Sequence, residues 1–241
     1  MIRHRASLVA MATIAALLPV AALAQDAPGL DQLAGGLGQN AVLVVVALTA
    51  LSLAPAIAIM VTAFPFIVTV LSILRQAIGL QQSPPNMLIV SLAIFLTWFI
   101  MDPVLREAWQ VAGAPLQDGS IGIAEAIQRG VVPFQGFMSA RTDPDTLRGL
   151  AEIAPAGGDP AERLSVLIPA FMLSEIQRAF EIGFLIALPF LIIDLVVSAV
   201  LMAMGMMMVP PVVVSLPFKL AFFVVVDGWT MIAGALVRSY Q

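Results

Sequence analysis

The side chains that could carry charge-dependent chemistry in this chain are few, and several lie among apolar residues. Asp194, Lys219 and Asp227 each interrupt a long apolar run, and Glu175 and Arg178 stand shortly before the first of these runs. An ionised group that faces hydrocarbon is costly, so such charges normally face a helix bundle, a cavity or a partner subunit. Glu175 or Asp194 could neutralise Lys219. We expect buried ion pairs between helices of the same or neighbouring subunits, with a proton or ion pathway as the alternative.

Residues typical of catalytic and metal sites are scarce. The chain holds no Cys, and its one His is His4. Zinc and haem sites built from Cys or His, Cys nucleophiles and Ser–His–Asp triads therefore lack their residues. No G-x-x-x-x-G-K-[ST] sequence is present to bind ATP phosphates. We expect no enzymatic activity, no metal and no cofactor. The formal net charge of −4 and the lack of a basic patch argue against nucleic acid as a partner.

A cluster of Met is the second unusual feature. Five Met fall within residues 202–208, directly before Pro210 and Pro211. Met is unbranched and polarizable and fills irregular gaps. In a pore, a ring of such side chains could close on itself or around a sliding chain, and an apolar constriction gates by dewetting. Met side chains that only face lipid are an equally open interpretation.

The composition indicates a membrane protein. Of the 241 residues 61% are hydrophobic and 11% are charged, whereas soluble domains carry about 25% charged residues. Long apolar runs with internal Pro predict an all-α fold of the integral-membrane type, built from kinked helical hairpins with four crossings. The expected parts are a first apolar hairpin at 41–101, a polar extracytoplasmic insert at 102–163 and a second apolar hairpin with the Met-rich loop at 164–241. Short helices are expected in the insert near 104–111, 121–140 and 144–153, the last beginning with Asp143 as N-cap and Pro144.

The N-terminus has the pattern of a secretory signal. Residues 1–24 combine two early Arg, an apolar run and a final Ala-Leu-Ala, which predicts cleavage between Ala24 and Gln25. Residues 25–40 are Gly-rich and polar and are expected to be a flexible lead-in. Cleavage would leave the mature N-terminus outside the cytoplasm. An uncleaved first membrane helix is the alternative.

Three strings in the apolar parts resemble one known family. GMMMVPP at 205–211, SLPFKL at 215–220 and VDGW at 226–229 are similar to the FliP/SctR family, core subunits of flagellar and virulence type III export gates. The resemblance extends over residues 48–104 and 164–238. The MVPP string is closer to the flagellar branch, and a virulence-type gate subunit is the alternative.

The resemblance implies a function and partners. Family members form a ring of about five copies within a helical, closed assembly. They assemble with FliQ-type and FliR-type subunits in the bacterial inner membrane, and the assembly passes unfolded rod, hook and filament proteins. The family's methionine gasket maps onto Met206, Met207 and Met208. Its buried charges map onto Glu175 and Lys219.

Two positions depart from the family pattern. Pro65-Phe66 stands where the family commonly has Thr-Arg, and Gln177 followed by Arg178 stands where it commonly has Lys. The basic group of each element is thus lost or shifted. A secondary transporter that uses Asp194 and Asp227 to couple protons is the alternative from another class, although the chain lacks the internal repeat usual in transporters.

Overall fold

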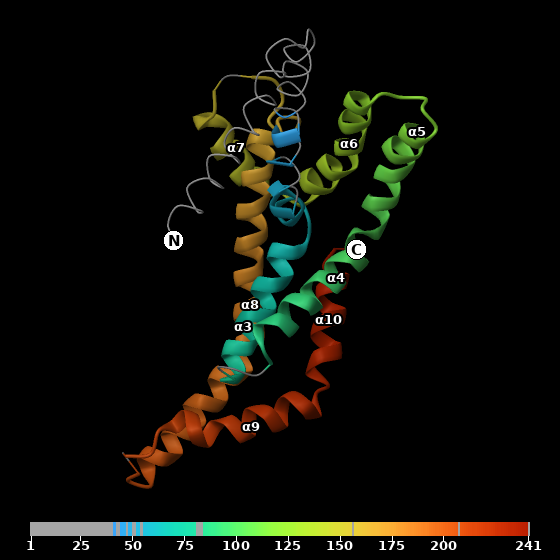
Figure 1. Ribbon diagram of the computed structural model, residues 1–241. Coiled ribbons are helices and arrows are strands. Elements are labelled where there is room, and N and C mark those ends of the chain that lie inside the picture. Colours follow the sequence, from blue (N-terminus) through green and yellow to red (C-terminus); the bar gives the residue numbers. More distant parts are fainter. Residues whose placement is uncertain are drawn as a thin grey trace, which may run out of the picture. The chain divides into compact units, whose positions relative to one another are not determined.

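The computed structural model describes residues 55–80, 84–155, 157–206 and 208–240, together with separate positions between 41 and 53 (Figure 1). The chain divides into two units, Met1–Pro55 and Ala56–Gln241. In the first unit the described positions from 41 to 55 are helical. The predicted signal segment 1–24, its cleavage site at Ala24 and Gln25, and the lead-in 25–40 lie outside the described residues.

The second unit consists of helices joined by turns and short irregular stretches, with no strand among its described residues, which confirms the predicted all-α class. Its helices, labelled as in Figure 1, are α3 (Phe64–Ile78), α4 (Asn86–Ala108), a π-helical turn η1 (Trp109–Gly113), α5 (Ala114–Gln117), α6 (Ile123–Arg141), α7 (Pro144–Ile153), α8 (Leu164–Ala203), α9 (Pro211–Val225) and α10 (Gly228–Arg238).

The core of this unit forms where α3 packs along α8. The α3 residues Phe66, Ile67 and Leu74 are fully buried and belong to one apolar cluster with residues of α4, α8, α9 and α10. The two helices approach closely at Gly183, since a Cβ placed there would lie only 2.4 Å from Cδ1 of Ile73. Interiors are packed as densely as organic crystals, so this contact fixes the register of α3 on α8.

Helix α4 differs from the expectation that the first hairpin ends at Asp102-Pro103. It continues through both residues and, with η1 and α5, forms one apolar segment from Asn86 to Gln117. An internal Pro removes one backbone hydrogen bond and does not always end a helix. Here Asp102 forms an ion pair with Arg106 one turn later, at 2.8 Å between Oδ2 and Nε, and α4 packs against α6.

The polar segment contains the expected helices in part. The structure places α6 and α7 close to the predicted ranges 121–140 and 144–153, whereas the helix expected near 104–111 is the end of α4 and the start of η1. The predicted cap of α7 is confirmed, because the Asp143 carboxylate accepts a hydrogen bond from the Thr146 backbone N–H at 2.8 Å. This bond holds the pKa of the Asp143 carboxyl below its usual range.

Two helices are long and apolar enough to cross a membrane, Asn86–Gln117 and Leu164–Ala203. The pair α9 and α10, bent by 62°, would form a third crossing. The part of the chain that the structure describes therefore holds two or three candidate crossings where the sequence predicts four. One reason is that α3, with 15 residues, is shorter than the roughly 20 residues that a spanning helix needs, because the first apolar run breaks at residues 61–63.

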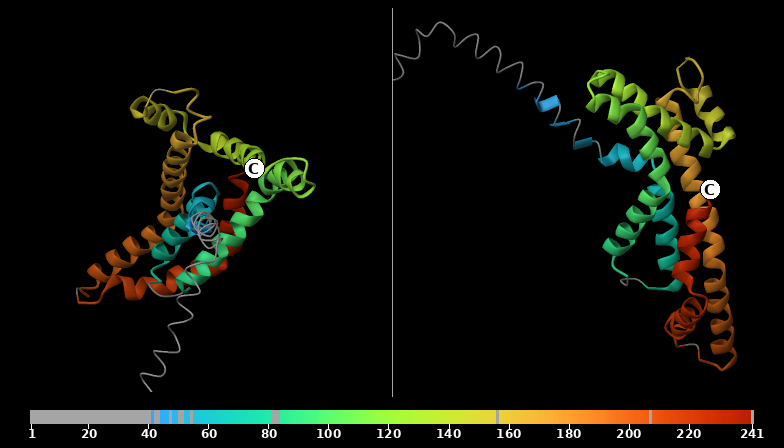
Figure 2. Two further views of the ribbon diagram at one scale, coloured as in Figure 1. Left: turned by 45° about the horizontal axis from the view of Figure 1, so that its top comes forward. Right: turned by 90° about the vertical axis from the view of Figure 1, so that its right-hand side faces the viewer.

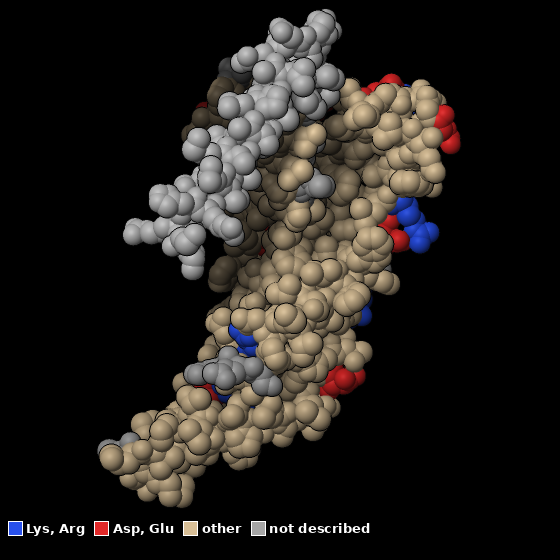
Figure 3. Space-filling model, viewed as in Figure 1, with Lys and Arg blue, Asp and Glu red and all other residues tan. Residues whose placement is uncertain are grey.

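Helices α8 and α9 form a hairpin at one end of the second unit (Figures 1 and 2). The end of this hairpin, residues 204–210, carries no Asp, Glu, Lys or Arg. Figure 3 shows the same region without charged side chains on the face that it displays. The hairpin tip is therefore an apolar protrusion, which we call the Met tip (residues 204–210).

Candidate functional site

The Met tip has a defined backbone where it leaves α8. Gly205 adopts a left-handed φ of 72°, which costs glycine little. The N–H of Gly205 donates to the carbonyl of Met202 at 3.0 Å, and the N–H of Met206 donates to the carbonyl of Leu201 at 2.9 Å. This pair of bonds is the Schellman arrangement that ends many helices. At the other side, Pro210 is the N-cap of α9 and Pro211 is its first residue. The N–H that Pro lacks would have no partner within the helix at its start.

The Met side chains of the tip are exposed. Met206 is 44% exposed and Met208 is 95% exposed, and Met207 lies outside the described residues. Burying an apolar side chain of this size is favourable by about 1.5–3 kcal/mol. A side chain as exposed as that of Met208 gains this energy only by contact with another molecule or with lipid. The tip is therefore suited to contact something outside this chain.

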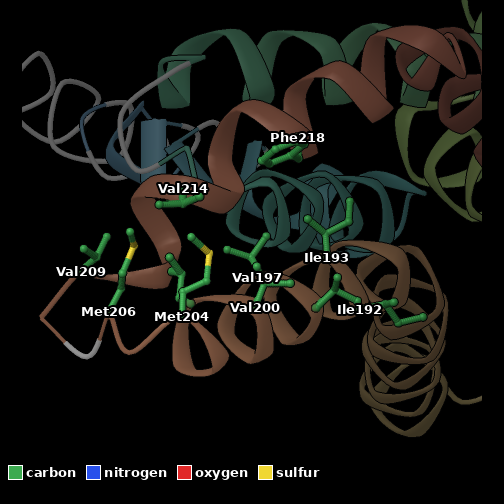
Figure 4. A pocket seen from close by; sticks show the side chains of 11 residues that line it. Ile192, Ile193, Val197, Val200, Met204, Met206, Val209, Val214 and Phe218 are labelled. Atoms are coloured by element: carbon green, nitrogen blue, oxygen red, sulfur yellow. The ribbon is translucent and has the colours of Figure 1, made fainter.

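An apolar groove of about 630 Å³ separates α8 from α9 beside the Met tip. Figure 4 shows Met204 and Met206 along this groove together with Val197, Val200 and Val209. All residues that line it are aliphatic, Met or Phe. The groove thus separates the two helices near the tip. A polar contact joins them farther along the hairpin.

That polar contact is centred on Lys219 of α9. Its Nζ lies 2.6 Å from Oδ2 of Asp194 in α8 and donates to the carbonyl of Ala77 in α3 at 3.0 Å. The hydroxyl of Ser215, one turn before Lys219, donates to Oδ1 of Asp194 at 2.6 Å. Three helices therefore meet at one neutral pair. Of the two acids that the sequence offers for Lys219, the structure brings Asp194 to it and places Glu175 elsewhere.

Glu175 is fully buried in a separate cluster that links α6, α8 and the residues after α10. Its Oε1 accepts from Nη1 of Arg178 at 2.9 Å and from Nε of Arg141 at 3.1 Å, and its Oε2 accepts from the Tyr240 hydroxyl. Arg141 also lies over the Tyr240 ring at 3.9 Å and donates to the carbonyl of Ser239 at 2.6 Å. Arg178, shifted by one position from the usual family site of the basic residue, thus contacts Glu175.

Burial raises the pKa of the Tyr240 phenol far above its ordinary value, and the nearby Glu175 carboxylate adds to this effect. Tyr240 therefore stays a hydrogen-bond donor. The sequence does not indicate that Tyr240 and Arg141 contact Glu175, because they lie 65 and 34 residues from it. The one available signal is that Tyr240 is the chain's single Tyr.

Asp227 takes no part in a buried ion pair within the described part of this chain, and its expected pairing with a neighbouring subunit stays a prediction. It is exposed, forms no salt bridge with another described residue, and stands at the break between α9 and α10 with a φ of 49°. Asp tolerates this left-handed conformation better than most residues. Its carboxylate accepts from the Thr230 hydroxyl at 3.2 Å. Asp227 therefore shapes the bend and does not neutralise Lys219.

The charged residues of the described part do not form a metal site, since no group of three or more His, Cys, Asp or Glu comes together there. The two buried clusters are compensated by Arg, Lys and Tyr. The arrangement instead consists of a charge-free Met tip at the end of a hairpin. Two polar clusters hold this hairpin against the remaining helices.

Comparison with known proteins identifies relatives over nearly the whole chain. The model of the FliP family matches residues 47–236. The flagellar biosynthetic protein FliP of Caulobacter vibrioides is 48% identical over 245 residues, which cover 100% of this chain and 92% of that protein. The protein of the same name from Agrobacterium fabrum is 50% identical, with 80% of this chain and 81% of that protein covered. The one from Bacillus subtilis is 45% identical, with 80% and 89% covered.

Proposed function

Because the chain belongs to the FliP family of flagellar biosynthetic proteins, we propose that its α8–α9 hairpin lines the conduit of the flagellar type III export gate. Membership makes the chain a component of the flagellar export apparatus, and its long apolar helices agree with a place in a membrane. The observation that carries the proposal is the Met tip, an exposed and charge-free protrusion anchored by two buried polar clusters.

The gasket consists of Met206, Met207 and Met208 from each copy in a ring of about five, whose copies contact one another head to tail. Met has three rotatable side-chain bonds and adapts to irregular partners. The tips pack together when the gate is idle and spread around an unfolded rod, hook or filament protein in transit. A wall without charge at this level favours no particular substrate sequence, which suits a conduit for many different chains.

The remaining parts of the proposal concern assembly. The ring binds FliQ-type and FliR-type subunits, lies in the bacterial inner membrane and contains several crossings per copy. The signal at residues 1–24 is cleaved between Ala24 and Gln25, so that the mature N-terminus and the segment 102–163 lie outside the cytoplasm. The chain is not an enzyme, and the energy for export comes from partner proteins or the proton gradient.

The proposed gasket is tested by measuring whether the idle gate conducts ions. Changing Met206, Met207 and Met208 together to Gly removes the packing side chains while leaving both polar clusters in place. We expect inner-membrane vesicles with the assembled variant to conduct ions that wild-type vesicles exclude. Met202→Gly with Met231→Gly is the control, because both residues are exposed Met outside positions 206–208. Normally assembled triple-variant gates with unchanged conductance would contradict the proposal.

A further inference from the structure

A second apolar groove lies between α4 and α10, away from the Met tip, with a volume of about 730 Å³. One wall carries residues at helical spacing on α4, and the other is formed by α10. The wall residues are Leu92, Leu96 and Phe99 on α4 and Thr230, Ala233, Gly234 and Val237 on α10, with Trp229 and Arg238 at the two ends. A groove with aliphatic and aromatic walls and a narrow helix on one side fits an extended hydrocarbon chain.

The two ends of the groove differ in polarity. Trp229 lines it at the start of α10, and Arg238 lines it at the end of the same helix. They are nine residue steps apart along the helix, or about 13 Å at 1.5 Å per residue. The Arg238 guanidinium folds back across Gly234, so that a Cβ built on Gly234 would lie 3.1 Å from Nη1. The missing side chain at Gly234 therefore lets the Arg238 charge reach the groove.

The end of the groove near Arg238 is also the polar end of α4. Pro103 of α4 lies with Val237 and Tyr240 around an adjacent small cavity, and next to Pro103 stand Asp102 and Arg106, which pair with each other at 2.8 Å. Because that pair is neutral, it does not compensate Arg238. Within the described ranges Arg238 forms no salt bridge with an Asp or Glu. Arg238 is thus the one charged residue among those that line the groove.

The length of α10 matches one leaflet. Its 11 residues span about 16 Å, which is roughly half of a 30 Å hydrocarbon core. The cation at one end of the groove matches the charged headgroup of a phospholipid. The apolar groove that leads away from it, of about leaflet depth, matches an acyl chain. Basic residues at membrane surfaces attract anionic lipids.

We propose that the α4–α10 groove binds an anionic phospholipid, with the headgroup phosphate on Arg238 and one acyl chain running along Leu96 toward Trp229. A phosphate oxygen accepts the guanidinium hydrogen bonds, and charge-assisted bonds of this kind are stronger than neutral ones. The acyl chain covers apolar walls that are otherwise open. The site requires the membrane location of the chain and is independent of the role of the Met tip.

The groove carries its own reporter, because Trp229 lines it. The chain has three Trp, at positions 98, 109 and 229. The full-length protein with Trp98→Phe and Trp109→Phe, reconstituted in phosphatidylcholine vesicles, therefore reports on Trp229 alone. Phosphatidylglycerol or phosphatidylcholine brominated along the acyl chain is then added in equal, small amounts. We expect an apparent affinity for the brominated phosphatidylglycerol about fivefold higher, the effect of one basic residue near an anionic headgroup.

Three variants of this reporter protein locate the effect. Arg238→Gln should abolish the preference for phosphatidylglycerol, and Arg238→Lys should retain most of it. The double variant Asp102→Asn with Arg106→Gln is the matched control, since it removes the nearby pair without changing the net charge at this end, and it should leave the preference unchanged. Equal quenching by both lipids in the reporter protein, or loss of the preference in this double variant as well, would overturn the proposal.

A second measurement does not depend on reconstitution. Export complexes that contain the otherwise wild-type chain are purified from membranes, and their bound phospholipid is counted by native mass spectrometry. The wild-type chain should retain phosphatidylglycerol that the Arg238→Gln chain loses at equal assembly. Assembled complexes that show no bound lipid, and in which brominated lipid does not quench Trp229, would mean that a helix of a neighbouring subunit fills the groove.

Discussion

Replacing Asp194 by Asn should destabilise the chain, because it leaves Lys219 inside the protein without a counter-charge. The Lys219 side chain is 5% exposed, and its Nζ contacts Oδ2 of Asp194 at 2.6 Å and the carbonyl of Ala77 at 3.0 Å. Asn retains an acceptor oxygen of similar shape. The substitution therefore removes the charge and keeps the packing, so any loss of stability reports the ion pair.

The size of the effect follows from the burial of the two partners. Two unit charges about 4 Å apart attract by about 4 kcal/mol at an effective dielectric constant of 20. Breaking a fully buried pair typically costs about 3–5 kcal/mol. The Asp194 side chain is 32% exposed, and solvent screening lowers the value for a partly exposed group. We expect the Asp194→Asn chain to lose about 2–3 kcal/mol of unfolding free energy.

The double variant Asp194→Leu with Lys219→Met separates a structural pair from a proton carrier. It removes both charges at similar volume, a replacement that is often neutral or stabilising, so most of the stability and assembly should return. Thermal unfolding of the purified proteins, complex assembly and motility of complemented cells are the assays. Variants that all assemble and unfold like wild type, yet all lose export, would refute the structural interpretation and favour an ion-coupled role for Asp194.

Four further substitutions test other positions of the second unit. Tyr240→Phe removes the hydroxyl that donates to the buried Glu175 carboxylate, and should cost about 2 kcal/mol in thermal unfolding; an unchanged midpoint would contradict the bond. Gly183→Ala forces a Cβ to 2.4 Å from Ile73 and should cost about 1 kcal/mol or more by overpacking. Gly136→Ala, where a Cβ meets no atom within 4 Å, should instead stabilise by about 0.5–1 kcal/mol. The lowered pKa of Asp143 gives α7 a stability that is present above the ordinary Asp pKa and is lost as pH falls through the lowered value. Asn also caps helices but does not titrate there, so amide exchange of α7 in Asp143→Asn should lose this acid dependence.

Much of the fold could be predicted from local patterns in the sequence. The helical class and the α8–α9 hairpin follow from apolar runs bounded by Pro and Gly, and the start of α7 follows from Asp143 and Pro144. These features depend on residues close together in the chain. The Met cluster is likewise visible from spacing alone, and the structure adds that Met206 and Met208 are exposed beside a groove.

Contacts between distant segments could not be predicted in this way. From the hydrophobic pattern, either Glu175 or Asp194 could pair with Lys219. The packing of α8 on α3 and α9 is what brings Asp194 to it. Nothing local joins Arg141 to Tyr240, which are 99 positions apart in the numbering. Asp102-Pro103 resembles a helix end, yet α4 continues through both residues to Ala108, with Asp102 paired to Arg106 one turn later.

The central claim is that the Met tip contacts the protein in transit, and site-specific cross-linking tests it most directly. The chain has no native Cys, so Met208→Cys introduces a single thiol at the tip. Met231→Cys on α10 is the control, because Met231 is also exposed but lies outside the tip. With an export substrate stalled in the gate and carrying one Cys in its unfolded segment, a disulfide should form with residue 208 and not with residue 231. Cross-links to residue 231 but none to residue 208, in a gate that still exports, would contradict the account.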